Sequence, residues 1–243
     1  MKQTISVLII CLTSVIGTSA QDIAQQFPSV KEVKLDLKKC SVTILKRTDN
    51  ANTIDFKFVN AKNQKAPIIE LGNGRLRIDQ SYEPGFFTML DTDAELQLTV
   101  PDGIDFNIQM EDGDLSLVNV TGSFNSFLHK GDINGTVSTT GASHFESESG
   151  DVNIKLMKGL DFNISVASGS STATLDFAGQ AINGKVKMEA FYGSGTINSP
   201  LAFSSQNIIQ SDGPNYITKS VAIGEKDINI TLSTGPGTIS LVL

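Results

Sequence analysis

The sequence predicts an all-β protein folded as a β-solenoid, similar to a parallel β-helix, with a more irregular N-terminal β region in one elongated domain. Period-two alternation of apolar and polar residues runs through most of the chain, whereas helical periodicity is nearly absent. A glycine-centred turn also recurs every 18 to 24 residues in the last two thirds of the chain. Such a period, built from strands, is typical of stacked solenoid repeats. The predicted repeat turns lie at Gly113, Gly131, Gly150, Gly169, Gly193, Gly213 and Gly235.

Residues 1–20 are predicted to be an export signal peptide. Lys2 supplies a positive charge, residues 5–16 form an apolar stretch too short to span a bilayer, and residues 18–20 offer a small-residue cleavage site. A lipoprotein signal with an acylated Cys11 is the alternative, but the large residue before that cysteine disfavours it. The sequence therefore predicts export to the periplasm, the cell surface or the extracellular medium.

Residues 21–100 are predicted to form an N-terminal β-strand region and cap. The apolar face of its first strands changes parity at Lys38 and Lys39, which predicts a turn or corner there. Cys40 is the only cysteine that cleavage would leave, so no intramolecular disulfide is expected. Because Cys40 shares a strand face with Val42, we expect a small buried side chain rather than a reactive thiol.

A loop in this region carries large apolar side chains between polar strands. If they are exposed, they form a binding patch for a partner or ligand. The favoured alternative is that the loop folds over an open end of the solenoid and hides its core, as terminal caps of repeat proteins do. The residues concerned are Tyr82, Phe86, Phe87 and Met89.

Residues 101–243 are predicted to form β-solenoid repeats of about 20 residues. Each repeat offers two short strands around a glycine turn, and glycine is expected because the corner needs a positive φ that strains residues with a Cβ. One rung alone buries too little apolar surface to offset its chain entropy. Rungs stacked about 4.8 Å apart would cover one another and form a continuous apolar column.

One segment, Val100-Pro101-Asp102-Gly103, precedes two turns of similar sequence, Gly113-Asp114-Leu115-Ser116-Leu117 and Ser149-Gly150-Asp151-Val152-Asn153-Ile154. In these segments the chain resembles the DUF4097 family of proposed adhesins, whose members carry V-P-x-G followed by repeated S-G-D-[IV]-x-[LV] turns. The likeness covers about residues 30–243. It implies a secreted, solenoid-like all-β protein of the bacterial envelope. The later turns depart from the pattern and are expected to differ, because other residues replace the aspartate at Ser170, Ser194, Pro214 and Pro236.

Aspartates follow three successive turn glycines, at Asp114, Asp132 and Asp151. If the rungs are in register, these carboxylates stack one strand spacing apart and repel by about 1 kcal/mol per pair in water. A Ca²⁺ ion would relieve the repulsion through oxygen ligands. Alternatively, each carboxylate accepts local backbone hydrogen bonds in an Asx-type turn, and the denser glycine motif of calcium-binding solenoids is missing. We expect no other cofactor.

Composition and motifs disfavour several classes of function. The net charge of −7 and the lack of a Lys/Arg cluster disfavour nucleic acid and anionic membranes as partners. No second apolar segment is long enough to cross a membrane. His129 and His144 are the only histidines, and no metal-protease or catalytic-triad motif includes them. Residues 179–186 fit G-x-x-x-x-G-K but lack the following Ser or Thr that a phosphate-binding loop needs.

Three functional classes remain open. The favoured class is an exported, non-enzymatic envelope or cell-surface protein, an adhesin or binding module whose solenoid face contacts an envelope protein or a glycan. The second is a carbohydrate-active enzyme, similar to a polysaccharide lyase, on the same scaffold. The third is a calcium-stabilised structural module. The sequence specifies neither the ligand nor the oligomeric state.

Overall fold

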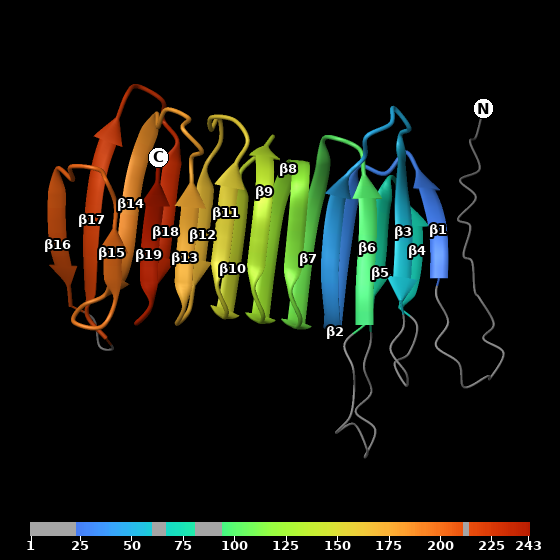
Figure 1. Cartoon of the computed structure of the whole chain (residues 1–243), viewed down its shortest axis with the longest axis horizontal. Coiled ribbons are helices and arrows are strands. Elements are labelled where there is room, and N and C mark those ends of the chain that lie inside the picture. Colours follow the sequence, from blue (N-terminus) through green and yellow to red (C-terminus); the bar gives the residue numbers. More distant parts are fainter. Residues whose placement is uncertain (1–22, 60–66, 81–93, 211–213) are drawn as a thin grey trace, which may run out of the picture.

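The computed structural model describes residues 23–59, 67–80, 94–210 and 214–243, and these residues form strands and turns with no helix (Figure 1). The predicted all-β class is confirmed. Within this part of the chain there is consequently no helix long and apolar enough to cross a membrane. Several predicted features lie outside the described residues: the signal peptide at 1–20, the turn at Gly213, and the loop with Tyr82, Phe86, Phe87 and Met89.

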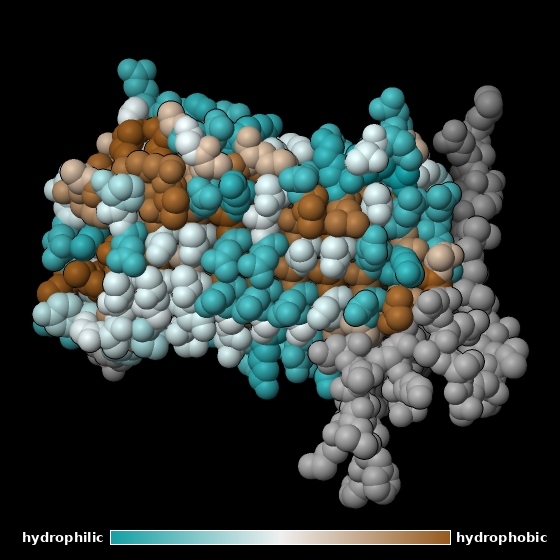
Figure 2. Space-filling model, in the orientation of Figure 1, coloured by the Kyte–Doolittle hydropathy of each residue, from teal (hydrophilic) through white to brown (hydrophobic). Residues whose placement is uncertain are grey.

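The strands form two rows that face each other, a front row and a back row in the view of Figure 1. The outer surface of the front row is the face shown in Figure 2. The front row holds β1 (Ile23–Pro28), β3 (Thr53–Val59), β6 (Ala94–Val100), β9 (Ile133–Thr139), β11 (Val152–Leu156), β13 (Thr172–Asp176), β15 (Thr196–Asn198) and β19 (Thr238–Val242). The back row holds β4 (Ile68–Gly72), β5 (Arg75–Asp79), β7 (Ile104–Asp112), β10 (Ser143–Ser149), β12 (Ile164–Ser168), β14 (Gly184–Phe191), β16 (Ser205–Ile209), β17 (Tyr216–Ile223) and β18 (Asn229–Thr234).

Two long strands, β2 (Glu32–Lys46) and β8 (Leu115–Lys130), contribute to both rows and join the described strands into one 19-stranded sheet. Strand β2 pairs with β7 up to Lys39 and with β6 from Cys40 onward, so the chain turns the corner at the predicted place without leaving the strand. In β8 the register shifts between Val118 and Val120, where Asn119 has a φ of 56°.

Parallel pairing stacks the central strands in register. We call one back-row strand and the front-row strand that follows it a rung. From one end to the other, the parallel back-row strands are β5, β2, β7, β8, β10, β12, β18 and β14. The corresponding front-row strands are β6, β2, β8, β9, β11, β13, β19 and β15. Antiparallel pairs extend both ends, with β1, β3 and β4 at one end and β17 and β16 at the other.

The rungs are not stacked in sequence order. Strand β2 lies between the β5–β6 rung and the β7–β8 rung, although it precedes both in the chain. The C-terminal β18–β19 rung lies between β12–β13 and β14–β15. The N-terminal strands are therefore part of the same two rows as the repeats, and the last rung of the chain is an internal one.

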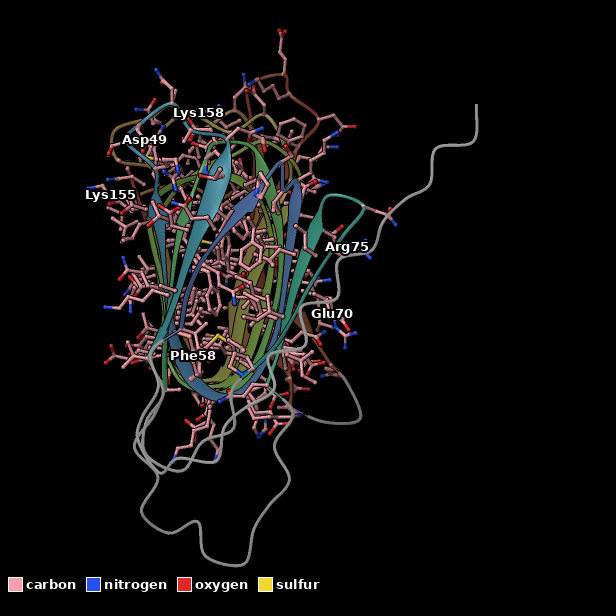
Figure 3. The ribbon with its side chains drawn as sticks, turned by 90° about the vertical axis from the view of Figure 1, so that its right-hand side faces the viewer. Asp49, Phe58, Glu70, Arg75, Lys155 and Lys158 are labelled. Atoms are coloured by element: carbon pink, nitrogen blue, oxygen red, sulfur yellow. The ribbon has the colours of Figure 1, made fainter. Side chains whose placement is uncertain are left out.

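The core is the apolar layer between the rows. Figure 3 looks along the stack: Lys155 of β11 points away from one row, Arg75 of β5 lies beyond the other, and Phe58 lies between them. Alternate residues of the central strands are buried, and registered neighbours bring like side chains together. Phe106, Phe124 and Phe145 form such a stack on successive rungs, with ring centroids 5.3 Å apart at each step. Cys40 is fully buried, as predicted.

Candidate binding surface

Glycines form a column at the corners between the back and front rows. A Cβ at Gly131 would lie 2.1 Å from the carbonyl oxygen of Gly113, and a Cβ at Gly150 would lie 2.1 Å from that of Gly131. Gly113 and Gly131 have positive φ, but Gly150, Gly169 and Gly235 do not. The close approach of a neighbouring carbonyl is therefore the requirement that these corners share, and the positive φ expected from the sequence applies to only two of them.

The column continues through the later rungs with one change of residue. Gly235 stacks on Gly169, since a Cβ there would lie 2.3 Å from the Gly169 oxygen. In the β14–β15 rung the stacked glycine is Gly195, where a Cβ would lie 2.7 Å from the carbonyl oxygen of Gly235. Gly193, the predicted repeat turn, has a φ of 88° and no atom within 4 Å of a Cβ built on it. It lies in the turn just before the corner, outside the column.

The three predicted aspartates form a hydrogen-bonded ladder beside these glycines. The backbone N–H of Asp132 donates to Oδ1 of Asp114, and that of Asp151 donates to Oδ1 of Asp132, both at 2.8 Å. Thr172 N–H donates in the same way to Oδ1 of Asp151 at 2.8 Å. Each carboxylate thus accepts from the next rung rather than from its own turn. These N–H groups donate to the negatively charged carboxylates and stabilise them.

Calcium binding by Asp114, Asp132 and Asp151 stays a prediction. In the described residues no group of three or more His, Cys, Asp or Glu side chains is placed to hold one metal ion. Each of the three aspartates accepts one hydrogen bond at Oδ1 in the ladder, which leaves its Oδ2 and the remaining lone pairs for a cation.

The outer surface of the front row carries an unbroken line of uncharged polar side chains, which we call the polar row. Registered pairs connect its members from strand to strand, and none of them is fully buried. Its members are amides and hydroxyls that alternate with the buried core residues of the same strands. In spatial order they are Gln97, Thr43, Ser116, Asn134, Asn153, Thr174, Ser240 and Asn198.

The polar row is long and regular. Neighbouring strands are about 4.8 Å apart, so the row from Thr43 to Asn198 is about 30 Å long. Asn153 Nδ2 donates to Asn134 Oδ1 at 3.2 Å, which orients both amides along the row. Figure 2 shows white and teal side chains, the colours of intermediate and hydrophilic residues, across the middle of this face. Charged groups flank the row, as in the pair Lys155 Nζ and Asp176 Oδ2 at 3.9 Å.

A shallow hollow of about 530 Å³ continues the polar row at its N-terminal end. Gln97, the first member of the row, lines it together with Gln26, Asp55 and Lys57. Gln26 Nε2 donates to Asp55 Oδ1 at 2.9 Å and closes one side of the hollow with polar groups. The row and the hollow therefore adjoin each other along the front of the molecule, and the hollow adds apolar lining from Ala24 and Phe56.

The sequence analysis did not identify the polar row, although its signal was present. Ser116, Asn134 and Asn153 each occupy the third position after the turn glycine, the variable x of the motif. Period-two alternation predicts that this residue points outward, because buried residues lie on both sides of Ser116 and Asn153 and Ile133 before Asn134 is buried. Parallel register then places the three side chains in line.

The two histidines lie on the outside of the back row, away from the polar row. His129 Nδ1 contacts Glu148 Oε2, and His144 Nε2 lies 2.8 Å from Glu146 Oε2. Each histidine is thus paired with a carboxylate on the surface, and neither is brought to the aspartate ladder.

Comparison with known proteins identifies the family and the fold. The family model of DUF4097, described as Toastrack, matches residues 30–174 and 92–198, more than half of the chain. A solved structure of a proposed cell adhesion protein from Clostridium sporogenes is 17% identical, with a TM-score of 0.53 over 92% of this chain and 99% of that one. A proposed adhesin from Bacteroides fragilis is 12% identical over 93% of this chain and 99% of that one, with a TM-score of 0.32. No curated protein matches the sequence.

Proposed function

Since the chain belongs to the Toastrack DUF4097 family, we propose that it is an exported, non-enzymatic binding module of the cell envelope, a β-solenoid that binds its ligand along the front face. The polar row is the observation that carries this proposal. Eight registered strands contribute one uncharged amide or hydroxyl each to one line, and the core needs none of them for packing. The name of the Clostridium sporogenes protein, a proposed cell adhesion protein of the same fold, supports this function.

The chemistry of the polar row favours an extended, neutral glycan as the ligand. Amides and hydroxyls donate and accept hydrogen bonds, as sugar hydroxyls do, and no charged side chain interrupts the row. An anionic polymer would find no line of Lys or Arg to neutralise it. A row of about 30 Å repeats the same contact at each strand. Individually weak contacts can therefore add up along one polymer chain.

A glycan array probed with the purified protein tests the proposal. The double change Asn134→Ala and Asn153→Ala removes the two central amides, and we expect at least a tenfold loss of glycan binding. Asn125→Ala is the matched control, because Asn125 is exposed at the middle of the back row. Binding by the wild type should change little with salt, since the row carries no charge.

Three outcomes would contradict the proposal. Binding that survives the double change would locate the ligand elsewhere. An equal loss of binding in the Asn125→Ala control would show that the loss is not specific to changes on the front face. Cleavage of a polysaccharide during incubation would favour the carbohydrate-active enzyme instead. Thermal melting of all variants must stay close to that of the wild type for the comparison to hold.

A further inference from the structure

Strand β16 is an edge strand at the C-terminal end of the stack (Figure 1). It pairs antiparallel with β17 along one side, from Ser205 opposite Ser220 to Ile209 opposite Tyr216. No described strand pairs with its other side. The outer N–H and C=O groups of this strand are therefore available to a further strand.

The edge lacks the devices that normally prevent strand pairing. Its five residues include no Lys, no Pro and no other charged residue, and its register with β17 is continuous. Ile208 and Ile209 are 49% and 46% exposed, unusually high values for large apolar side chains on a strand. Because neighbouring residues of a strand point to opposite faces, each face of the edge presents one isoleucine.

The segment that contains β16 carries no charge, and the strand paired with it carries one charged residue, Lys219, opposite Gln206. Residues 190–210 contain no Asp, Glu, Lys or Arg, in a chain of which 19% of the residues are charged. The same end exposes Tyr192, whose N–H donates to the carbonyl oxygen of Asn215 beside β17. Two copies of a protein with a net charge of −7 repel each other, and the electrostatic cost of approach is lower along an edge strand that carries no acidic residue.

The opposite end of the stack is different. There the edge strand of the back row is β4, which carries Glu70, and the next strand β5 carries Arg75 and Arg77. Arg77 Nη1 lies 3.6 Å from Glu70 Oε2, and Figure 3 shows Glu70 and Arg75 on the outer side of the back row at this end. Charged side chains protect this edge, so it is a poor partner for the uncharged β16.

We propose that the partner of β16 is the β16 strand of a second copy of this chain, paired antiparallel about a two-fold axis. An identical strand is self-complementary in that arrangement. If residue i of one copy pairs with residue j of the other, residue j of the first copy pairs with residue i of the second. The pairing satisfies the free backbone groups of both edges and covers the exposed isoleucines. It joins the two back rows into one continuous sheet and leaves both polar rows open.

The test is the mass of the wild-type protein in solution, measured by sedimentation velocity and light scattering over a wide range of concentration. We expect a dimer, and we expect Ile208→Lys to weaken it at least tenfold, because the change places a desolvated charge beside its symmetry mate. Val118→Lys is the matched control: Val118 is 40% exposed on the front row, away from this edge, and its variant should remain dimeric. Both variants should have the melting temperature of the wild type.

A second variant covers the case in which Ile208→Lys fails to fold. Asn207→Asp adds a like charge to the edge without removing apolar surface, so its dimer should dissociate at low salt and return at high salt. A wild type that stays monomeric at every concentration overturns the proposal, as does a dimer that resists both variants. Open-ended polymers that Ile68→Lys and Ile208→Lys both disrupt would also overturn it, in favour of head-to-tail contacts between the two ends.

Discussion

Gly131 lies directly against the carbonyl oxygen of Gly113, and a Cβ on Gly131 would be 2.1 Å from that oxygen. Gly150 has the same relationship to Gly131 one rung further on. At each of these corners the preceding rung occupies the space that a side chain would fill. Because these glycines lack side chains, neighbouring rungs can keep the same spacing at the corners as along the paired strands of the rows.

Gly131→Ala should destabilise the protein by about 3 kcal/mol, because the methyl group meets backbone that cannot move away and Gly131 has a φ of 115°. In thermal melting this corresponds to a fall of roughly 6–12 °C for a protein of this size. Gly193→Ala separates the two causes. Its φ is also positive but nothing lies within 4 Å of the added methyl group, so only the backbone strain of about 1 kcal/mol is expected. Equal losses in the two variants would contradict the stacking argument.

The aspartate ladder predicts different effects for two substitutions of Asp132. Asp132→Ala leaves the N–H of Asp151 without its acceptor and should cost about 1 kcal/mol. Asp132→Asn keeps an oxygen acceptor and removes one charge from a column of three, so its unfolding free energy should stay within about 0.5 kcal/mol of the wild type. Urea unfolding without and with Ca²⁺ measures both effects. If the asparagine variant is as unstable as the alanine variant, or if calcium stabilises only the wild type, the charge itself has a role and the calcium hypothesis gains support.

The strand class and the corner positions could be predicted because they depend on local patterns. The alternation that buries Val33, Leu35 and Leu37 changes phase before Cys40, and the structure turns at that point. Likewise, the motif places an aspartate after Gly113, Gly131 and Gly150, and the parallel register aligns them. These features need only period-two geometry and the stacking of equal repeats.

The order of the rungs could not be predicted from such patterns. The residues of β18 and β19 alternate like those of any other rung, so nothing local shows that they lie between β12–β13 and β14–β15. That order depends on which pairs of strand edges bury the most surface, a comparison between segments far apart in the chain. The polar row was missed for a related reason, because a single outward Ser or Asn is unremarkable until the register aligns it with others.

Acid should weaken the link between the turn after β2 and the turn after β6. Lys46 Nζ lies 2.8 Å from Asp102 Oδ2, and this hydrogen bond holds the pKa of Asp102 below its ordinary value. A carboxyl whose pKa is lowered by folding contributes stability above its unfolded pKa, near 3.9, and loses it as the pH falls through the folded value. Both side chains are largely exposed, so the contribution is a few tenths of a kcal/mol. Asp102→Asn should flatten the dependence of the urea midpoint on pH between pH 5 and pH 2; an unchanged slope would argue against this pair.

The C-terminal rung is internal in the stack, although it is last in the chain. Its buried side chains should therefore contribute to the unfolding free energy as much as those of other internal rungs. Leu232 of β18 is fully buried, between Val166 of β12 and Met188 of β14. Leu232→Ala should therefore cost roughly 2–5 kcal/mol, the range for a large cavity in a packed core. Val242→Ala is the control from the same rung: Val242 is 43% exposed, and the change should cost less than about 0.5 kcal/mol. If the last rung were a peripheral addition, both variants would unfold at nearly the wild-type urea concentration. If it is inserted as the register shows, only Leu232→Ala lowers the midpoint, and it does so in one transition that includes the whole stack.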